Sequence, residues 1–322
     1  MIRPFAYLVP VYAAALNVKN AAYERGWIHP DQLKWPVISV GNLSVGGAGK
    51  TPLVIRLAQL LKTKGVSVDV LSRGYGRNVT GIERVDVEGD AAHYGDEPLL
   101  IARTAEVPVY VAASRYKAGL LAERDAGNFG IHLLDDGFQH RRLARDMDIL
   151  VVHASDFEEG LLPAGRLREP LSALKRASAI VLRAEDHTLE VKLKERDISA
   201  PIWIQHRKLL IEPVSRAIAF CGIARPDEFF AVLRVNGVEL SATIALRDHQ
   251  AYSHAEMQQI LAMFRQHHAE CFVTTEKDAV RMARKDRQRL EAVAPLHVAR
   301  LEVSLDEEAA ITRQMLNLLV RK

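Results

Sequence analysis

Apolar positions along the first two thirds of the chain form short runs that are typical of buried strands. The runs lie at 36–40, 67–72, 107–112, 131–134, 147–152 and 179–182. Most intervals between them carry apolar residues at helical spacing, as in 53–61 and 115–124. Strands that alternate with helices predict an α/β fold with a mostly parallel sheet and helices on both faces.

The pattern changes beyond residue 189, where a polar stretch precedes two extended runs at 201–205 and 208–212. Further strands and helices are then expected as far as a last helix at 306–320. We therefore expect four parts. They are an N-terminal helical segment (1–30), a main domain (31–200), an extended linker (201–216) and a smaller α/β domain (217–322).

A glycine-rich loop lies between the first strand and the following helix. Its residues are Ser44, Val45, Gly46, Gly47, Ala48, Gly49, Lys50 and Thr51. Between a strand and a helix, such a loop lets backbone N–H groups curl around phosphate oxygens at the positive end of the helix dipole. We predict a main domain of the P-loop NTPase type, in which Lys50 reaches the β- and γ-phosphates and the Thr51 hydroxyl binds Mg²⁺. Ser44 departs from the general motif, which has glycine at this position.

Acidic residues at two other places are candidates for the same site. Asp135 and Asp136 follow an apolar strand that His132 interrupts, and P-loop enzymes hold Mg²⁺ with an acid at the end of such a strand. Asp96 and Glu97 stand where a helix is expected to begin. They are either carboxylates near the transferred phosphate or a plain helix cap.

Two basic loops add candidates for contacts with an anionic ligand. The loop 73–77 carries two arginines at the C-terminal end of a strand, which is where α/β sheets bind ligands. The loop 161–170 contains Arg166, Arg168 and Glu169, and an arginine there would neutralise charge on a transferred phosphate. The alternatives are an ordinary turn for the first loop and a solvated surface loop for the second.

The sequence does not decide what the apolar run at the N-terminus packs against. Its larger side chains fall on roughly one helical face: Phe5, Leu8, Tyr12 and Leu16. The run is shorter than the ~20 residues that span a bilayer, and cleavage as a signal peptide would export a nucleotide-binding protein away from its nucleotide. Two interpretations remain open, a helix that lies in a membrane interface and a helix that packs on the protein's own core.

The net charge and the cysteine content limit which kinds of partner and covalent link we expect for this protein. Among 322 residues the formal net charge is only +3, so the chain has no strong basic signature and we expect no nucleic-acid partner. The two cysteines, Cys221 and Cys271, lie far apart in apolar runs, and we expect both to be buried free thiols.

Six motifs in this order give the chain a resemblance to a known family. They are 40–52, 71–76, 95–98, 134–140, 167–170 and 275–278. Together they resemble tetraacyldisaccharide 4'-kinase, the lipid A 4'-kinase of Gram-negative bacteria, over nearly the whole chain. Ser44 belongs to this family's own version of the glycine-rich loop.

The resemblance implies an enzyme that uses ATP and Mg²⁺. It would transfer the γ-phosphate to the 4'-hydroxyl of a tetraacyldisaccharide 1-phosphate, a lipid-linked precursor, in lipopolysaccharide biosynthesis. It would act on the cytoplasmic face of the inner membrane as a peripheral, monotopic protein bound through its N-terminal helix. We expect it to act as a monomer.

The resemblance also implies roles for single residues around the phosphates and the metal. Lys50 and Thr51 would hold the phosphates and Mg²⁺. Three carboxylates would surround the metal, namely Asp135, Asp136 and Glu169.

Three further residues have implied catalytic roles. Asp96 resembles the catalytic base, and Arg168 resembles an arginine that acts on the phosphates. His249 corresponds to a histidine that supports the base, although a lone histidine is more commonly a hydrogen-bonded structural residue.

Two other functions are considered beside this one. A P-loop kinase for a soluble metabolite would leave the apolar N-terminus unexplained. A regulatory or maturation ATPase commonly carries a lysine just before the glycine pair of its loop, and here that residue is Val45.

Overall fold

The strands form where short apolar runs lie in the sequence. They are β1 (Val37–Asn42), β2 (Ser67–Ser72), β3 (Glu83–Arg84), β4 (Val109–Val111), β5 (Gly130–Asp135), β6 (Met147–Val151), β7 (Ala179–Arg183), β8 (Ile202–Leu210), β9 (Ala217–Cys221), β10 (Leu240–Ala245), β11 (Cys271–Thr275) and β12 (Leu296–Leu305). The structure, a computed structural model, describes residues 5–47, 49–127, 129–248, 250 and 252–320.

Helices occupy most of the intervals between the strands. They are α1 (Val9–Glu24), α2 (Lys50–Lys62), α3 (Ala91–Tyr94), α4 (Asp96–Ala105), α5 (Arg115–Ala126), α6 (Leu189–Lys194), α7 (Pro226–Val235), α8 (His254–Gln266), α9 (Glu276–Arg281), α10 (Arg284–Glu291) and α11 (Glu308–Val320). Short 3₁₀ helices add η1 (Ala6–Leu8), η2 (Ala154–Phe157), η3 (Leu171–Arg176) and η4 (Ala184–Asp186).

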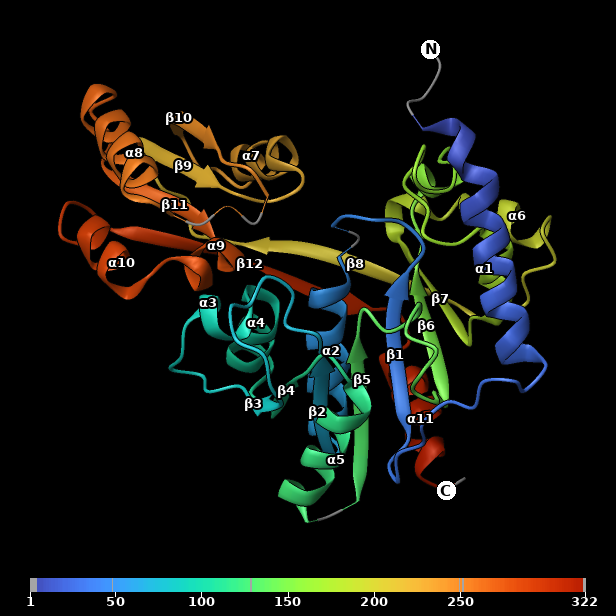
Figure 1. Cartoon of the computed structure of the whole chain (residues 1–322). Helices are drawn as coiled ribbons and strands as arrows, with labels where there is room; N and C mark the ends of the chain where they lie inside the picture. The colour runs from blue at the N-terminus through green and yellow to red at the C-terminus, as the bar shows by residue number, and fades with distance from the viewer. Residues whose placement is uncertain (1–4, 48, 128, 249, 251, 321–322) are drawn as a thin grey trace.

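The described strands form one 12-stranded hydrogen-bonded order, β10-β9-β11-β12-β8-β7-β6-β1-β5-β2-β4-β3 (Figure 1). Pairing is parallel except between β3 and β4 and between β8 and β12. The predicted mostly parallel sheet is therefore confirmed. The two runs expected at 201–205 and 208–212 are one continuous strand, β8.

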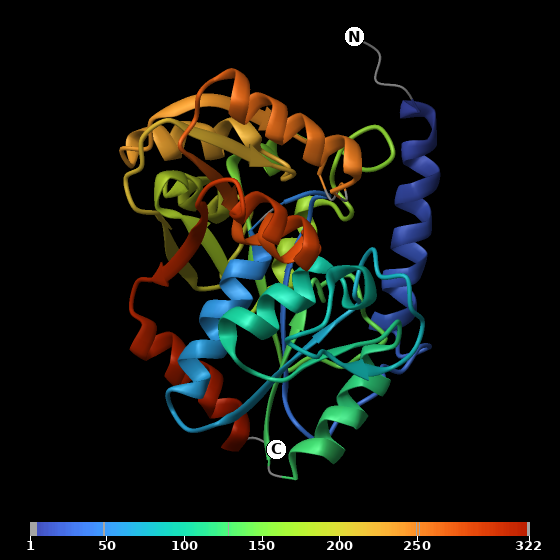
Figure 2. The ribbon, with the colours of Figure 1, turned by 90° about the vertical axis from the view of Figure 1, so that its left-hand side faces the viewer.

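The helices of the first part cover both faces of its sheet, as predicted (Figures 1 and 2). On one face α2, α4 and α11 pack on the strands, and Leu57, Ile101 and Met315 share one core with Val40. On the other face α5, η3 and α6 cover the sheet in two further clusters. The helical spacing of apolar residues in α2 is what gives this helix its single buried face.

The C-terminal strands have their own two helical layers. α7 packs on one face of β9, while α8 and α10 pack on the other. Cys221 and Cys271 are buried and free, as expected. The division at residues 201–216 stays a prediction, but the last helix returns to the first sheet, where Arg56 Nε donates to Glu308 Oε1 at 2.7 Å.

The N-terminal helix α1 lies on the first part of the molecule without burying any of its residues. Its contacts are partly polar, since Tyr12 Oη donates to the Arg168 carbonyl at 2.9 Å and the Arg141 guanidinium lies 4.8 Å from the centre of the Tyr23 ring. Half-buried Leu16 lies on the same inner side as Tyr12, whereas Phe5 and Leu8 are exposed. The single apolar face expected for these four residues is thus partly covered by the protein at Tyr12 and Leu16 and left exposed at Phe5 and Leu8.

His132, which interrupts the apolar run of β5, is fully buried between two carboxylates. Its Nδ1 lies 2.8 Å from Asp69 Oδ1, and its Nε2 lies 3.5 Å from Glu123 Oε1. The ring stacks on Trp35 with centroids 4.9 Å apart. Burial opposes the charged form, but the two carboxylates outweigh burial and raise the pKa of His132 to about 9.

This buried charge cluster makes stability depend on pH above neutrality. Because the pKa of folded His132 lies above the unfolded value of 6.5, its contribution is complete below pH 6.5 and disappears as the pH rises through about 9. We expect the free energy of unfolding to fall over that interval by on the order of 3 kcal/mol at most. Denaturant unfolding from pH 6 to pH 9.5 measures this fall. His132→Gln is the control, and an equal fall in that variant would contradict the assignment.

Candidate active site

The glycine-rich loop joins the C-terminal end of β1 to the first turn of α2. Gly46 and Gly49 have φ angles of 107° and 74°, which residues with side chains rarely adopt. Gly49 directly precedes α2, so the free N–H groups of the helix begin at the loop. Ala48 lies outside the described residues. The backbone conformation that the glycines permit is the one that a phosphate-binding loop requires.

Lys50 lies at the centre of a polar network below this loop. Its Nζ donates to Asn42 Oδ1 at 2.9 Å and lies 3.3 Å from Asp136 Oδ1. The Asn42 amide in turn donates to the Ser44 carbonyl at 2.8 Å. Asn42 is completely buried at the end of β1. It therefore orients both the lysine and the start of the loop.

Arg168 completes this network. Its two terminal nitrogens contact Asp136 at 2.9 and 3.0 Å in a bidentate pair, and Nη2 also donates to Asn42 Oδ1 at 2.6 Å. Arg168 is therefore part of the phosphate loop's surroundings, and the alternative of a solvated surface loop does not hold for it. The bidentate geometry fixes the Asp136 carboxylate, whose residue has a positive φ of 51°.

The paired acids at the end of β5 differ in electrostatic environment. Burial raises the pKa of Asp135 to about 7, and the charges of Glu97 and Asp136 add to this effect. Burial also acts on Asp136, but Lys50 and Arg168 outweigh it and hold the pKa of Asp136 below its usual range. The influence of Glu97 shows that the acidic turn at the start of α4 faces the same site.

The donors at this site suit Mg²⁺, which prefers oxygen ligands. Thr51, Asp135 and Asp136 supply such oxygens, and burial raises the pKa of Asp135 although Lys50 and Arg115 act in the opposite direction. Glu169 is buried close by, with Oε2 2.7 Å from Arg176 Nη2. In the described part of the chain, three or more His, Cys, Asp or Glu residues nowhere form a cage for a metal. The expected placement of Asp135, Asp136 and Glu169 around one metal therefore stays a prediction.

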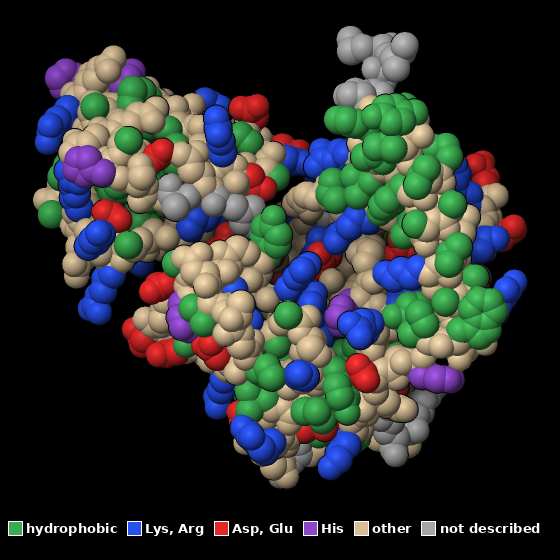
Figure 3. Space-filling model, in the orientation of Figure 1, with side chains coloured by type: hydrophobic (Ala, Val, Ile, Leu, Met, Phe, Trp, Pro, Cys, Tyr) green, Lys and Arg blue, Asp and Glu red, His purple; other side chains and the backbone are tan. Residues whose placement is uncertain are grey.

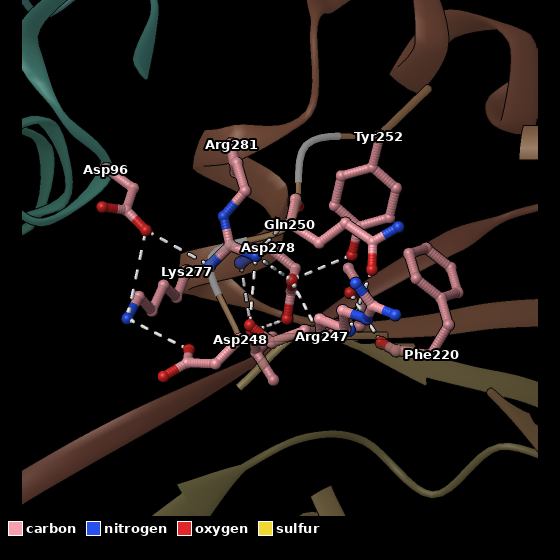
Figure 4. A network of polar contacts seen from close by, with 12 residues as sticks. Asp96, Phe220, Arg247, Asp248, Gln250, Tyr252, Lys277, Asp278 and Arg281 are labelled. Carbon is pink, nitrogen blue, oxygen red and sulfur yellow. Dashed lines mark hydrogen bonds and ion pairs between the residues drawn. The ribbon is translucent and has the colours of Figure 1, made fainter. Parts of the chain in front are cut away.

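Asp96 lies at the start of α4 and faces the C-terminal part of the molecule (Figure 4). Its Oδ2 lies 3.2 Å from Arg281 Nη2 and 3.9 Å from Lys277 Nζ, both on α9. Its Oδ1 accepts the Glu97 N–H at 3.0 Å, so Asp96 also has part of the capping role considered above. A buried carboxylate between two cations from another part of the chain is more than a helix cap.

The Asp278 carboxylate lies beside Arg281 and stabilises that side of the network (Figure 4). It is fully buried and accepts hydrogen bonds from the Gly222 N–H and the Tyr252 hydroxyl, each at 2.9 Å. Arg281 Nη1 donates to the Gly222 carbonyl at 3.0 Å and to the Gln250 carbonyl at 3.3 Å. The loop after β10 is thus held next to Asp96.

His249 belongs to this loop but lies outside the described residues. Its neighbour Asp248 has Oδ1 3.8 Å from Lys277 Nζ, the same ammonium that contacts Asp96. The role implied for His249 therefore stays a prediction.

Sequence reasoning missed several residues that the fold brings to the site. Asn42 stood inside a quoted motif, and its signal was a polar residue at the end of a buried strand. Lys277 and Arg281 reach the site only because α9 packs against α4. Arg115 is buried near the acids, and burial followed by the charge of Arg73 lowers the pKa of Arg115 to about 10.

A parallel α/β sheet with this loop, lysine and acid pair defines a P-loop protein that binds a nucleoside triphosphate. The family model for tetraacyldisaccharide-1-P 4'-kinase matches residues 1–320. The chain belongs to this family, and the predicted membership is confirmed.

Individual relatives agree with the family match. The tetraacyldisaccharide 4'-kinase of Koribacter versatilis is 41% identical over 327 residues and covers 98% of each chain. That of Geobacter metallireducens is 38% identical and covers 93% of each chain. The crystal structure of LpxK from Aquifex aeolicus in complex with ATP is similar over 99% of both chains, with a TM-score of 0.77 and 32% identity.

Replacing Asp278 tests whether its carboxylate holds the polar network around Gly222, Tyr252 and Arg281 together. Asp278→Ala leaves the Gly222 N–H and the Tyr252 hydroxyl without their buried acceptor, and it removes one of several acceptors of Arg281 Nη1, so we expect the free energy of unfolding to fall by about 3 kcal/mol or more. Tyr252→Phe removes one hydrogen bond and should cost about 1 kcal/mol. Denaturant unfolding compares the two variants, and equal losses would show that Asp278 does not hold the network together.

Proposed function

We propose that this protein is a tetraacyldisaccharide 4'-kinase. It transfers the γ-phosphate of ATP to the 4'-hydroxyl of a tetraacyldisaccharide 1-phosphate, in the synthesis of the lipid A precursor. The observation that carries this proposal is the family match over residues 1–320, which includes the phosphate loop, the acid pair and the Asp96 turn. It favours this reaction over a kinase for a soluble substrate and over a regulatory ATPase.

In this proposal the loop 44–51 binds the phosphates. Its backbone N–H groups and the first turn of α2 face the anion, and Lys50 supplies a charge that Asn42 and Asp136 already orient. Mg²⁺, held by Thr51 and the acids Asp135 and Asp136, supplies further neutralisation of phosphate charge when it is bound. Phosphoryl transfer depends mostly on such positioning and charge neutralisation.

Asp96 is the proposed base that accepts the proton of the sugar hydroxyl. A sugar hydroxyl is a weak nucleophile, so a carboxylate within reach of its proton helps the attack. The cations Arg281 and Lys277 hold the Asp96 carboxylate in place. Because both come from α9, the base is ordered only when the two parts of the molecule lie together, which also limits the access of water.

Arg168 has a role in orienting Asp136 as well as in neutralising phosphate charge. Its bidentate pair with Asp136 stabilises the acid at the metal position. Glu169 is the third proposed carboxylate near the metal, and its ion pair with Arg176 fixes its place. His249 is proposed to support Asp96.

Two substitutions test the roles of the loop and the base. We expect Lys50→Ala and Asp96→Asn each to lower kcat by at least about 100-fold, because one removes phosphate neutralisation and the other removes the proton acceptor. Transfer of labelled γ-phosphate to tetraacyldisaccharide 1-phosphate in detergent micelles measures this. Asp197→Asn, at a well-exposed acid, is the matched control. Near-normal turnover in either variant, with the fold intact, would contradict its role.

We further propose that α1 binds a membrane surface on the cytoplasmic face of the inner membrane, and that the protein acts there as a monomer. The outer face of the helix is apolar and solvent-exposed, with Tyr7, Val11 and Val18 exposed by 74%, 66% and 70% (Figure 3). In the described part of the chain, no helix is long and apolar enough to cross a bilayer. An exposed apolar stripe on a short helix suits the interface of a bilayer.

The apolar face of α1 can be tested separately from its packing. We expect Val11→Ser combined with Val18→Ser to lower binding to anionic lipid vesicles at least severalfold, because both side chains point away from the protein. Co-sedimentation with vesicles measures this. Val235→Ser combined with Val320→Ser, at two equally exposed valines, is the matched control. Unchanged binding in the α1 variant would leave the helix with a structural role only.

A further inference from the structure

Arg207 extends from β8 to the phosphate loop. The strand passes the N-terminal end of α2 (Figure 1). The guanidinium of Arg207 lies against Gly49, so closely that a Cβ atom at Gly49 would collide with Nη2. Gly49 is the last loop residue before Lys50, at the place where a bound phosphate is expected. A side chain from the junction of the two parts of the molecule therefore touches the nucleotide loop.

The guanidinium of Arg207 has hydrogen-bond donors that the protein does not use, although the charges of Glu185 and Glu228 act on it from a distance. Its Nε and Nη2 atoms are buried and have no hydrogen-bond partner among the described residues. Burial, followed by the charge of nearby Arg183, lowers the pKa of Arg207 to about 10. Burying an N–H group without an acceptor costs free energy. An arginine with such donors next to a phosphate loop is therefore a candidate for binding an anion.

Arg168 differs from Arg207 in its hydrogen-bond partners. It stands at the same loop, but its terminal nitrogens contact the Asp136 carboxylate and the Asn42 amide oxygen. Its Nε also lacks a partner, but both of its terminal nitrogens are already engaged with the protein. Arg207 differs from it because the terminal nitrogen Nη2 has no partner among the described residues.

We propose that Arg207 binds the phosphate oxygens of the nucleotide at the loop 44–51. Planar guanidinium groups suit phosphate oxygens, and the oxygens would supply the acceptors that Nε and Nη2 lack. The proposal rests on the proposed function in one respect, since it takes this loop as the ATP site. It also links nucleotide binding to the junction strand β8, which pairs with β7 of the first sheet and with β12 of the second.

Equilibrium binding to the full chain tests this without any lipid. We expect Arg207→Met to weaken the binding of ATP and of inorganic tripolyphosphate at least 10-fold, and Arg207→Lys to recover part of the loss. Arg300→Met, at an exposed arginine of the paired strand β12, should bind both ligands as the wild type does. Calorimetric titration at two salt concentrations measures the affinities.

Thermal unfolding without ligand separates phosphate binding from a structural role. Because the buried Nε and Nη2 donors of Arg207 have no hydrogen-bond partner among the described residues, we expect Arg207→Met to have a Tm equal to or above that of the wild type. A lower Tm, or ATP affinity within twofold of the wild type, would overturn the proposal. So would a wild type that binds neither ATP nor tripolyphosphate.

The proposed function fails separately from this inference. A wild type that binds ATP through Arg207 but does not phosphorylate tetraacyldisaccharide 1-phosphate would overturn the lipid kinase assignment alone. A lipid kinase whose ATP affinity is insensitive to Arg207→Met would overturn the role of Arg207 alone.

Discussion

The carboxylate of Asp136 balances two cations at the phosphate loop, and the geometry of the site depends on this balance. Lys50 comes from the helix after the loop and Arg168 from a segment more than a hundred residues later, yet both contact the same acid. Without it, two half-buried cations would face each other beside the loop and repel. With it, the acid, the lysine and the loop have fixed positions before any nucleotide arrives, which is the preorganisation that phosphoryl transfer requires.

The site is completed where two parallel sets of strands meet. One set of parallel strands ends at β8 and the other ends at β12, and these two strands pair antiparallel. The phosphate loop and α9 both lie near this pair of strands. α4 packs against α9 and brings Asp96 to Arg281. If Asp96 is the base, as proposed, its position depends on cations from the C-terminal part of the molecule, so the reaction would be sensitive to how the two parts lie together. The same arrangement would limit the transfer of phosphate to water.

The N-terminal helix lies beside the phosphate loop's surroundings and has an exposed outer side, which suits the role at a membrane proposed above. It is held on its inner side by contacts such as Tyr12 with the Arg168 carbonyl, next to the residues that surround the phosphate loop. Its outer side is apolar and free. Lys and Arg side chains gather in the hollow between this helix and the C-terminal part (Figure 3). An acylated, phosphorylated sugar would meet an apolar surface for its chains and a basic region for its head group.

Local sequence was enough to determine the glycine-rich loop, the alternation of strands and helices, and the acids after β5, because each depends on residues that are neighbours in the chain. It could not assign Asn42, Arg281 or Arg207 to the site, since their importance depends on which distant group faces them. In the sequence His132 is only a polar residue that interrupts an apolar strand. The fold places Asp69 and Glu123 beside it, and these two carboxylates explain its burial. Which side of α1 packs on the protein was also left open by the sequence, because that depends on the distant residues that it contacts, such as Arg168 and Arg141. Tertiary packing alone decided these points, because charge compensation and burial belong to pairs of residues far apart in the chain.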